Sequence, residues 1–442
     1  MVDTAVHLLK TRRFLPLFIT LFLGAFNDNL FKMAMVTIIT YELATKMGLN
    51  AGVLNPLAAG LFILPFMLFS AFAGQLADKY EKSRQIRIIK LVEIGIMALG
   101  AISLYFSIVS LMFVTLFMLG VQSTFFGPIK YSILPCHLKP NELIGGNALV
   151  ETATFISILM GNVVGGLLIL TDNGVLWTSA LTLTCAFIGW RSGALVPGTD
   201  RADPDLKINY NVFSESWRLI KRAKDNRQVF HSVLAISWFW FFGSLFLAQF
   251  PTYAEAIIGA DESVLTLFIA SFSLGIGAGS MLISRILKGE ITLKYVPLSA
   301  FFMTAFCIDL YFASGQAAAV KSDQLITIST YLNSATNWRV LLDFLGIAIA
   351  GGAYIVPLYT NIQSTSKKSE LSRMIASNNI INSFFIVSSA ILAAGLIMAG
   401  FTVTDVFLVG AVMNGAIVLL LMRMIPEDAM TKFIASFLDT NR

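Results

Sequence analysis

Long apolar runs separated by short polar turns make up most of this 442-residue chain. A helix of about 20 residues crosses a hydrocarbon layer about 30 Å thick, so each run is long enough to span a membrane. The pattern predicts twelve membrane-spanning helices. Their expected ranges are 14–43, 52–76, 86–108, 111–134, 144–170, 174–192, 229–258, 262–286, 294–314, 340–362, 374–399 and 403–424.

An internal repeat and a long polar stretch predict two halves. Segments that begin at Gly127 and at Val356 each contain a proline, and each continues into a short polar turn with Glu-Leu and a new helix that carries Asn. Such a repeat in a twelve-helix chain indicates two six-helix bundles related by an axis along the membrane normal. We therefore expect an all-α membrane protein with an N-terminal bundle at 1–192, a cytoplasmic linker at 193–228, and a C-terminal bundle with a short cytoplasmic tail at 229–442.

Composition and charge support this reading. The chain is 56% hydrophobic and 13% charged, with a mean hydropathy of +0.76, whereas soluble domains have about 25% charged residues. With the N-terminus inside, the outer loops contain only Lys46, Lys321 and Arg339, so the positive-inside rule places both termini in the cytoplasm. The net charge of +5 then reflects topology and not nucleic-acid binding. The linker segment Lys221-Arg222-Ala223-Lys224 either contacts anionic lipid headgroups or is a solvated loop.

The sequence does not indicate catalysis. Cys136, Cys185 and Cys307 show neither metal-ligand spacing nor a disulfide framework, and the three histidines are scattered. The chain has no Walker-type phosphate-binding loop. We expect a protein that is not an enzyme and that has no resident cofactor or metal.

A polar cluster interrupts the first apolar run. It consists of Asn27, Asp28, Asn29 and, one helical turn later, Lys32. At about 1.5 Å per residue, Asp28 lies roughly 22 Å beyond Arg13, well inside the hydrocarbon layer. A charge there costs at least ~2.5 kcal/mol and needs a partner or a wet cavity. Because Asp28 and Lys32 are four residues apart, they share a helix face, and we predict that they pair.

A motif between the second and third spans indicates a family. It reads Gly74-Gln75-Leu76-Ala77-Asp78 and is followed by basic residues as far as Arg84. Gly74 would let a neighbouring helix approach closely, and Asp78 could lie at a helix N-terminus or pair with a base such as Arg84. The segment resembles the loop signature of the major facilitator superfamily, although Glu81 replaces its second glycine. The resemblance implies the fold of that superfamily, and it implies a gating loop of Gly74, Asp78 and Arg84 that latches the two bundles in the outward-facing state.

Other segments resemble the lysophospholipid transporter branch, especially modules fused to phospholipid acyltransferases. The matching segments lie at 25–32, 127–131, 146–151, 237–241, 249–251 and 375–382. The resemblance implies alternating-access transport of lysophospholipids in the bacterial cytoplasmic membrane, inward for re-acylation. Since the chain ends soon after the last span, we expect a separate acyltransferase as partner. We further expect contacts with membrane lipids and a monomeric state.

The resemblance also suggests roles for polar residues within the spans. A lysophospholipid headgroup needs a polar central cavity, because it crosses hydrocarbon only at high cost. We expect Asn27, Asp28, Asn29, Lys32, Gln122, Lys130, Glu151, Gln249, Asn378 and Asn382 to line that cavity. Asp28 or Glu151 would receive an ammonium group, and Lys130 or Lys32 a phosphate. We hypothesise that substrate breaks the Asp28–Lys32 pair and takes its place.

Each role has an alternative. The Asp28–Lys32 pair would otherwise only join helices, Lys130 would extend to the interface, and Glu151 would make a structural hydrogen bond. Trp238, Trp240 and Phe241 either line a route for the acyl chain or pack against other helices. We expect Gly275, Gly277 and Gly279 to permit close helix packing.

Coupling and function also have alternatives. Asp28 could bind Na⁺ or H⁺ and couple an ion gradient to transport, or transport could be driven by trapping of the product. The rival functions are an ion-coupled exporter of drugs or small metabolites on the same fold and a non-transporting scaffold for a lipid-remodelling enzyme.

Overall fold

A computed structural model describes residues 4–47, 51–318 and 325–424, which fold almost entirely into helices. Twelve of the described helices are long. In the first half they are α2 (Leu15–Ile38), α4 (Ala51–Lys79), α5 (Lys82–Tyr105), α6 (Val109–Ser132), α8 (Leu143–Ile169) and α9 (Gly174–Ala194). In the second half they are α11 (Arg227–Thr252), α12 (Glu262–Leu287), α13 (Val296–Ala318), α15 (Ala335–Thr365), α16 (Leu371–Met398) and α17 (Val403–Met424).

Shorter helices lie at the ends of the long ones. They are α1 (Thr4–Leu8), α3 (Ala44–Met47), α7 (Leu134–His137), α10 (Val212–Asp225) and α14 (Ile328–Leu332), with π-helices η1 (Ile39–Leu43) and η3 (Tyr253–Ile258) and the 3-10 turn η2 (Pro140–Glu142).

Each of the twelve predicted spans corresponds to one long helix, which confirms the all-α membrane fold. Ten of the described helices are long and apolar enough to cross a membrane by composition alone. The other two long helices are α2 and α9. The mean hydropathy of α2 is lowered by the polar cluster from Asn27 to Lys32, although the rest of this helix is mostly aliphatic and aromatic.

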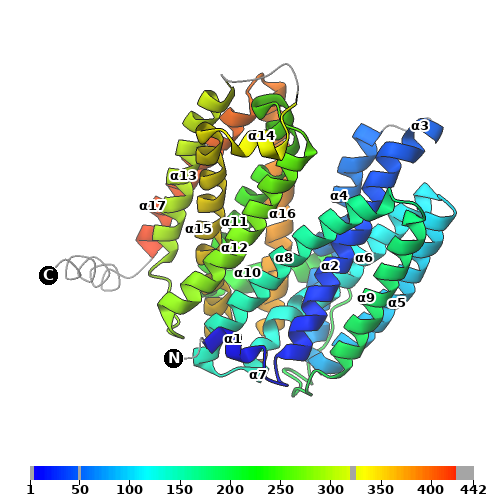
Figure 1. Ribbon diagram of the computed structural model, residues 1–442. Coiled ribbons are helices and arrows are strands. Elements are labelled where there is room, and N and C mark those ends of the chain that lie inside the picture. The colour runs from blue at the N-terminus through cyan, green and yellow to red at the C-terminus, as the bar shows by residue number, and fades with distance from the viewer. Residues whose placement is uncertain (1–3, 48–50, 319–324, 425–442) are drawn as a thin grey trace.

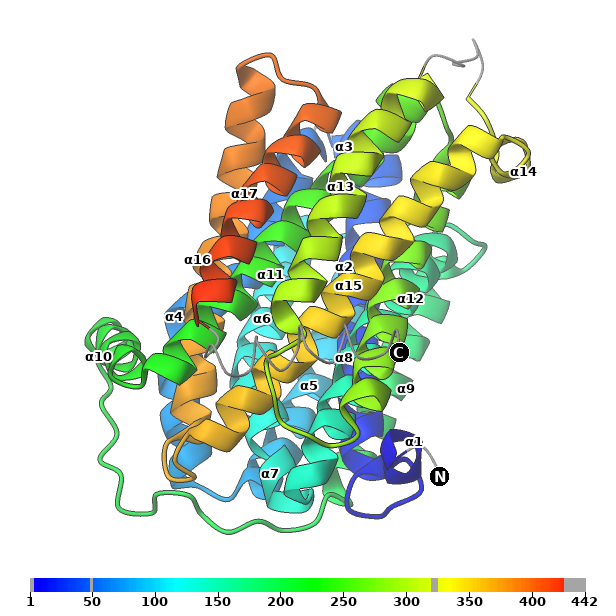
Figure 2. The same ribbon diagram turned by 90° about the vertical axis from the view of Figure 1, so that its left-hand side faces the viewer.

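The long helices form two bundles that lie side by side. Figure 1 shows α2 to α9 in one bundle and α11 to α17 in the other, and Figure 2 shows the second bundle from its outer side. Across the bundles, α4 packs against α16 and α8 packs against α12. We call the end of the molecule with α1 and α7 the terminal end and the end with α3 and α14 the opposite end (Figure 1).

Glycines bring the helix backbones close together. In the second bundle, a Cβ added at Gly275 would lie 2.6 Å from Ala348 Cβ, and Gly279 lies directly against the backbone of Ile349. Between α8 and α2, a Cβ on Gly161 would lie 2.6 Å from the carbonyl oxygen of Phe26. Small residues are suited to such contacts because helix association in lipid depends on close van der Waals packing. The expectation of close packing at the Gly275–Gly279 segment is confirmed.

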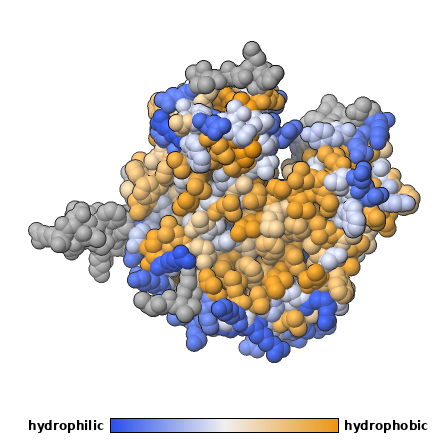
Figure 3. Space-filling view, in the orientation of Figure 1, coloured by the Kyte–Doolittle hydropathy of each residue, from blue (hydrophilic) through white to orange (hydrophobic). Residues whose placement is uncertain are grey.

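The polar linker contains a helix that the sequence did not predict. Within 193–228, α10 follows an extended segment and packs against α4 and α16 near the terminal end. The Asn211 side chain caps it by accepting a hydrogen bond from Ser214 N. The surface itself is divided by polarity: Figure 3 shows a broad apolar band between polar ends, and it shows the surface hollowed between the two bundles at the opposite end.

Candidate functional site

A network of charged and amide groups is buried within the first bundle. Glu93, on α5, accepts hydrogen bonds from Lys90 Nζ at 2.6 Å, Gln122 Nε2 at 2.9 Å and Asn27 Nδ2 at 3.1 Å. Asp28 Oδ2 accepts a hydrogen bond from Ser123 Oγ at 2.5 Å. We call Asn27, Asp28, Lys90, Glu93, Gln122 and Ser123 the first-bundle network. Its central carboxylate is therefore well supplied with donors, as a buried charge requires.

The predicted Asp28–Lys32 pair is not a direct contact, although the two charges attract each other. No ion pair joins these two residues in the described structure; Lys32 Nζ instead donates to Asn29 Oδ1 at 2.9 Å. The Lys32 Nζ also lies 5.9 Å from the centre of the Phe62 ring, on α4. Residues on one helix face can pair, but a shared face does not require them to do so. Here the α6 hydroxyl of Ser123 satisfies one oxygen of Asp28, and a neighbouring amide satisfies Lys32.

A second polar cluster lies where the two bundles meet. The Tyr131 hydroxyl, on α6, donates to Glu151 Oε1, on α8, at 2.6 Å. The Tyr131 ring stacks on that of Tyr359, on α15, with ring centroids 3.9 Å apart. Lys130 Nζ donates to Thr154 Oγ1 at 2.9 Å, so this lysine points between α6 and α8 and does not extend along the helix to its end. We call Lys130, Tyr131, Glu151, Tyr359 and Asn378 the inter-bundle site.

Several buried atoms of the inter-bundle site have no partner at hydrogen-bond geometry within the described chain. They are Glu151 Oε2 and both the oxygen and the nitrogen of the Asn378 side-chain amide. The Tyr359 hydroxyl interacts with Asn378 and with Trp240, on α11, although neither contact has hydrogen-bond geometry. A buried polar group without a partner costs about 1–3 kcal/mol. The inter-bundle site therefore has unused capacity for hydrogen bonding that a polar ligand could satisfy.

The gating loop holds the bundles together at the terminal end. Asp78, at the end of α4, accepts hydrogen bonds from the backbone N–H groups of Ser372 and Arg373 at 3.0 and 3.2 Å, and from Arg373 Nε at 2.9 Å. It thus binds the N-terminus of α16, where the helix dipole favours an anion. The alternative partner Arg84 is exposed and is not that base; Arg373, from the other bundle, is. Glu81 has φ −60° and ψ 124°, a conformation that does not need glycine.

A seal of neutral groups lies beside this contact. The side-chain amides of Asn147 and Gln363 bond each other in both directions, at 2.6 and 3.0 Å. Asn147 Nδ2 also donates to Thr360 Oγ1, and Gln363 Nε2 donates to the carbonyl of Tyr131. These bonds join α8 and α6 of the first bundle to α15 of the second. Together with Asp78–Arg373 they close the terminal end, which we call the latched state.

The predicted cavity residues do not converge on one site. Asn27, Asp28 and Gln122 belong to the first-bundle network, whereas Lys130, Glu151 and Asn378 belong to the inter-bundle site. Asn382 Oδ1 accepts a hydrogen bond from Ser237 Oγ at 2.7 Å inside the second bundle. Gln249 is half-buried near the end of α11, by the opposite end. The Asn29 amide donates to the Ala25 carbonyl one turn earlier.

The aromatic residues of α11 differ from one another. Trp238 stacks on Phe241, with ring centroids 5.0 Å apart, and donates its Nε1 to Asn414 Oδ1, so both pack within the second bundle. Trp240 instead stacks on Phe155 of the first bundle, with centroids 6.1 Å apart. Of the three residues predicted for an acyl-chain route, only Trp240 reaches across the bundles.

The structure adds residues that the sequence reading missed. Lys90, Glu93 and Ser123 were overlooked although Glu93 falls inside the third predicted span, where a carboxylate needs an explanation. Tyr131 and Tyr359 are uncharged, so no buried charge in the sequence marks them as candidate site residues. Arg373 lies just before the predicted span 374–399, and its bond to Asp78 joins positions 295 residues apart.

Comparisons with known proteins indicate the family of this chain. The family model described as Major Facilitator Superfamily matches residues 17–322. Curated relatives include the "Lysophospholipid transporter LplT" of Cronobacter sakazakii, 23% identical over 82% of each chain, and that of Shigella boydii serotype 4, 25% identical over 79% of each chain. The protein of the same name from Escherichia coli is also 25% identical over 79% of each chain.

Solved structures share the fold. The human organic anion transporter MFSD10 aligns with a TM-score of 0.73 at 11% identity, over 93% of this chain and 99% of that chain. FucP in the outward conformation aligns with a TM-score of 0.66 at 14% identity, over 92% and 98%. A bacterial ferroportin homologue in the outward-facing state aligns at 0.63 and 12% identity, over 91% and 98%. From the family match and the twelve-helix fold, this chain belongs to the major facilitator superfamily.

Proposed function

We propose that this protein transports lysophospholipids across the bacterial cytoplasmic membrane by alternating access, inward, where a separate enzyme re-acylates them. The curated relatives that carry the name lysophospholipid transporter support this substrate class. The observation that carries the proposal is the inter-bundle site, in which Glu151 Oε2 and both polar atoms of the Asn378 side chain have no partner at hydrogen-bond geometry. A zwitterionic or anionic headgroup offers the complementary groups.

In this proposal the headgroup binds between the bundles. Glu151 Oε2 accepts from an ammonium group of the headgroup, and Lys130 binds the phosphate as a compact cation with three donors. The Asn378 amide, from the second bundle, completes the hydrogen bonds. Because residues of both bundles take part, the occupied site differs between the two states of the transporter, as alternating access requires.

The proposal includes an orientation. The terminal end faces the cytoplasm, since the loops at this end contain most of the Lys and Arg residues. The latched state is then the outward-facing one. The likeness to FucP in the outward conformation and to the ferroportin homologue in the outward-facing state supports this assignment.

Asp28 is the residue at which a coupling cation would act. One of its oxygens, Oδ1, is buried without a partner, and it belongs to a network that includes a second carboxylate, Glu93. Sodium coupling predicts that replacing a Na⁺ gradient by a K⁺ gradient in proteoliposomes slows transport. Equal rates in the two gradients would exclude sodium as the coupling ion, and a pH gradient would then test H⁺.

The function is tested with purified protein in liposomes that carry a labelled lysophospholipid in one leaflet. We expect Glu151→Gln and Lys130→Gln each to lower the flipping rate at least about tenfold, because each loses a charge-assisted bond of about 1.5–3 kcal/mol. Asp172→Asn and Lys207→Gln are the matched controls, since both residues are exposed on loops. They should flip at the wild-type rate.

Two outcomes would contradict the proposal. If Glu151→Gln and Lys130→Gln both flip the lipid at the wild-type rate, the headgroup does not bind at the inter-bundle site. No flipping by wild-type protein, combined with outward flux of soluble cations, would favour an exporter. If neither substrate moves while the variants retain cellular function, a scaffold role is supported instead.

A further inference from the structure

The linker helix α10 has an apolar face that is largely exposed. Phe213 and Trp217 are exposed by 77% and 70% and lie four residues apart, on the same face of the helix. The opposite face, with Leu219 and Ala223, is buried. Leu219 packs with Ala71 of α4 and with residues of α16. A helix that exposes two large aromatic residues while it is anchored by its other face has the form of an interfacial membrane helix.

Basic residues lie beside these aromatic side chains. Arg218, Lys221 and Lys224 are exposed on α10; Lys221 is one turn beyond Trp217 and Lys224 two turns beyond it. Arg218 Nη1 pairs with Glu215 Oε2 at 3.0 Å, so Lys221 and Lys224 are the two lysines offered to an anion. Aromatic rings at the headgroup level flanked by snorkelling lysines are typical of a helix in the membrane interface. The only exposed carboxylate on α10 is Asp225, at its last position. The exposed surface is therefore cationic, which complements an anionic phospholipid.

The position of α10 along the bundle matches the interface. The helix packs at the level of Ala71, and the segment before it is bonded to Gln75 through Asn209. At about 1.5 Å per residue, these α4 positions lie roughly 6–12 Å from the end of α4 at Lys79. That depth corresponds to the boundary between headgroups and acyl chains, where interfacial helices lie.

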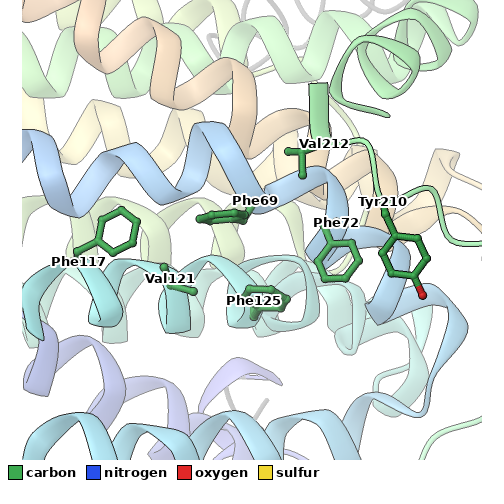
Figure 4. A pocket seen from close by; sticks show the side chains of 7 residues that line it. All are labelled: Phe69, Phe72, Phe117, Val121, Phe125, Tyr210 and Val212. Atoms are coloured by element: carbon green, nitrogen blue, oxygen red, sulfur yellow. The ribbon is translucent and has the colours of Figure 1, made fainter. Parts of the chain in front are cut away.

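An apolar pocket adjoins the start of α10. Its volume is about 370 Å³, and Figure 4 shows the side chains that line it. They are Phe69 and Phe72 from α4, Phe117, Val121 and Phe125 from α6, and Tyr210 and Val212 from the linker. The α6 residues extend from about 10 Å to about 22 Å from the end of that helix, so the pocket continues from the interface into the hydrocarbon level. An elongated apolar cavity at this depth suits one acyl chain.

We propose that α10 and this pocket form a binding site for an anionic phospholipid of the surrounding bilayer, with one acyl chain in the pocket and the phosphate beside Lys221 and Lys224. The site is separate from the inter-bundle site and does not depend on which substrate is transported. Arg222 on α10 also pairs with Glu370 at the start of α16, at 2.7 Å, three residues before Arg373 of the latch. Helix α10 is therefore joined to both bundles, through Leu219 to α4 and through Arg222 to α16.

The charge arm of the test compares lipid retention. Purified protein is delipidated in detergent, titrated with phosphatidylglycerol or phosphatidylcholine, and examined by native mass spectrometry. Each basic residue near an anionic surface contributes roughly fivefold to binding. We expect Lys221→Gln/Lys224→Gln to weaken phosphatidylglycerol retention roughly 25-fold and to leave phosphatidylcholine retention unchanged. Arg201→Gln/Lys207→Gln, two exposed positions in the same linker outside α10, is the matched control.

The apolar arm uses fluorescence. The difference in emission between wild type and Trp217→Phe reports on Trp217, and we expect lipids brominated on the acyl chain to quench it. Filling the pocket with Val121→Trp should lower phosphatidylglycerol retention without changing that quenching. Equal retention by the Lys221/Lys224 double variant and its control would overturn the anionic site. Quenching by aqueous acrylamide but not by brominated lipid would show that α10 is solvated, and unaltered retention in Val121→Trp would remove the acyl chain from the pocket.

Discussion

At the residue scale, the burial of Lys90 and Glu93 is explained by their hydrogen bonds. Both side chains are only 1% exposed, in the middle of a long membrane-spanning helix. Glu93 accepts from one lysine and two amides, and the Lys90 Nζ also lies 4.9 Å from the centre of the Phe126 ring. A buried pair with this many partners is stable as a unit and is costly to break from one side.

The first prediction compares the loss of one charge of this pair with the loss of both. Lys90→Met leaves Glu93 charged without its cation, and we expect it to lower the free energy of unfolding by about 3–5 kcal/mol. The double variant Lys90→Met/Glu93→Met removes both charges and should recover much of that loss. Thermal unfolding in detergent measures both, with Arg87→Met at an exposed position of the same helix as control. A single variant as stable as wild type would mean that the pair contributes nothing to the fold.

Sequence reasoning recognised the type of chemistry at this scale but not the partners. It identified Asp28 and Glu151 as buried carboxylates that need donors, and both are buried. It assigned Lys32 to Asp28 because sequence spacing gives only neighbours on the same helix. The actual donors, Ser123 and Tyr131, come from another helix, and their position depends on bundle packing.

At the element scale, the contact between α4 and α16 depends on one missing side chain. A Cβ at Gly74 would lie 2.6 Å from Ala376 Cβ and 3.1 Å from Arg373 Cα. The two helices therefore approach closely enough for Asp78 to reach the backbone N–H groups of Ser372 and Arg373. The glycine of the gating motif thus acts through helix spacing, and its aspartate acts through charge.

The second prediction concerns this spacing. Gly74→Ala should overpack the contact at a cost of about 1–3 kcal/mol, which shifts the equilibrium away from the latched state by roughly 5- to 150-fold. Ala376→Gly in the same chain removes the nearest clash and should restore part of the latched population. Distances between spin labels on the two bundles at the terminal end report these populations. If Gly74→Ala leaves the distance distribution unchanged, the close approach does not control the latch.

The spans were predictable because an apolar run of about twenty residues has few possible structures other than a membrane-spanning helix. For most spans the predicted ends agree with the helix ends to within a few residues. Helix α10 was missed because Phe213 and Trp217 stand in a polar stretch, where two aromatic residues alone do not indicate a helix. Its burial against α4 and α16 becomes visible only in three dimensions.

At the scale of the whole molecule, a native thiol can test the proposed orientation. Cys136 lies in α7 at the terminal end and is exposed, whereas Cys185 and Cys307 are buried. In the proposed topology, a membrane-impermeant maleimide should label Cys136 in inside-out vesicles and not in right-side-out ones. Cys136→Ser is the control for background labelling. Labelling in right-side-out vesicles and not in inside-out ones would place the terminal end outside, and the latched state would then be the inward-facing one.

The same thiol should also show a characteristic pH dependence. Desolvation of its sulfur, which faces the carbonyl of Ser132, raises the pKa of Cys136 above its ordinary value, although nearby Lys82 and Lys368 oppose the shift. Because the thiolate is the reactive form, a raised pKa makes labelling slow at neutral pH and faster as the pH increases toward the shifted pKa. Labelling rates measured between pH 7 and pH 9.5 should still be rising at the upper end. A plateau already below pH 8 would contradict the desolvated setting of the sulfur.

The strength of the amide seal at the terminal end helps to set how much binding free energy is needed to open that end. The bonds among Asn147, Gln363, Thr360 and the Tyr131 carbonyl are between neutral groups, and each such bond contributes only about 0.5–1.5 kcal/mol once water can replace it. Inverting a two-state population from 1:99 to 99:1 takes about 5.5 kcal/mol of preferential binding. The four seal bonds together contribute about 2–6 kcal/mol, which is comparable to that figure. The charged Asp78–Arg373 contact also closes this end, so it decides how much further binding free energy the transported molecule must supply.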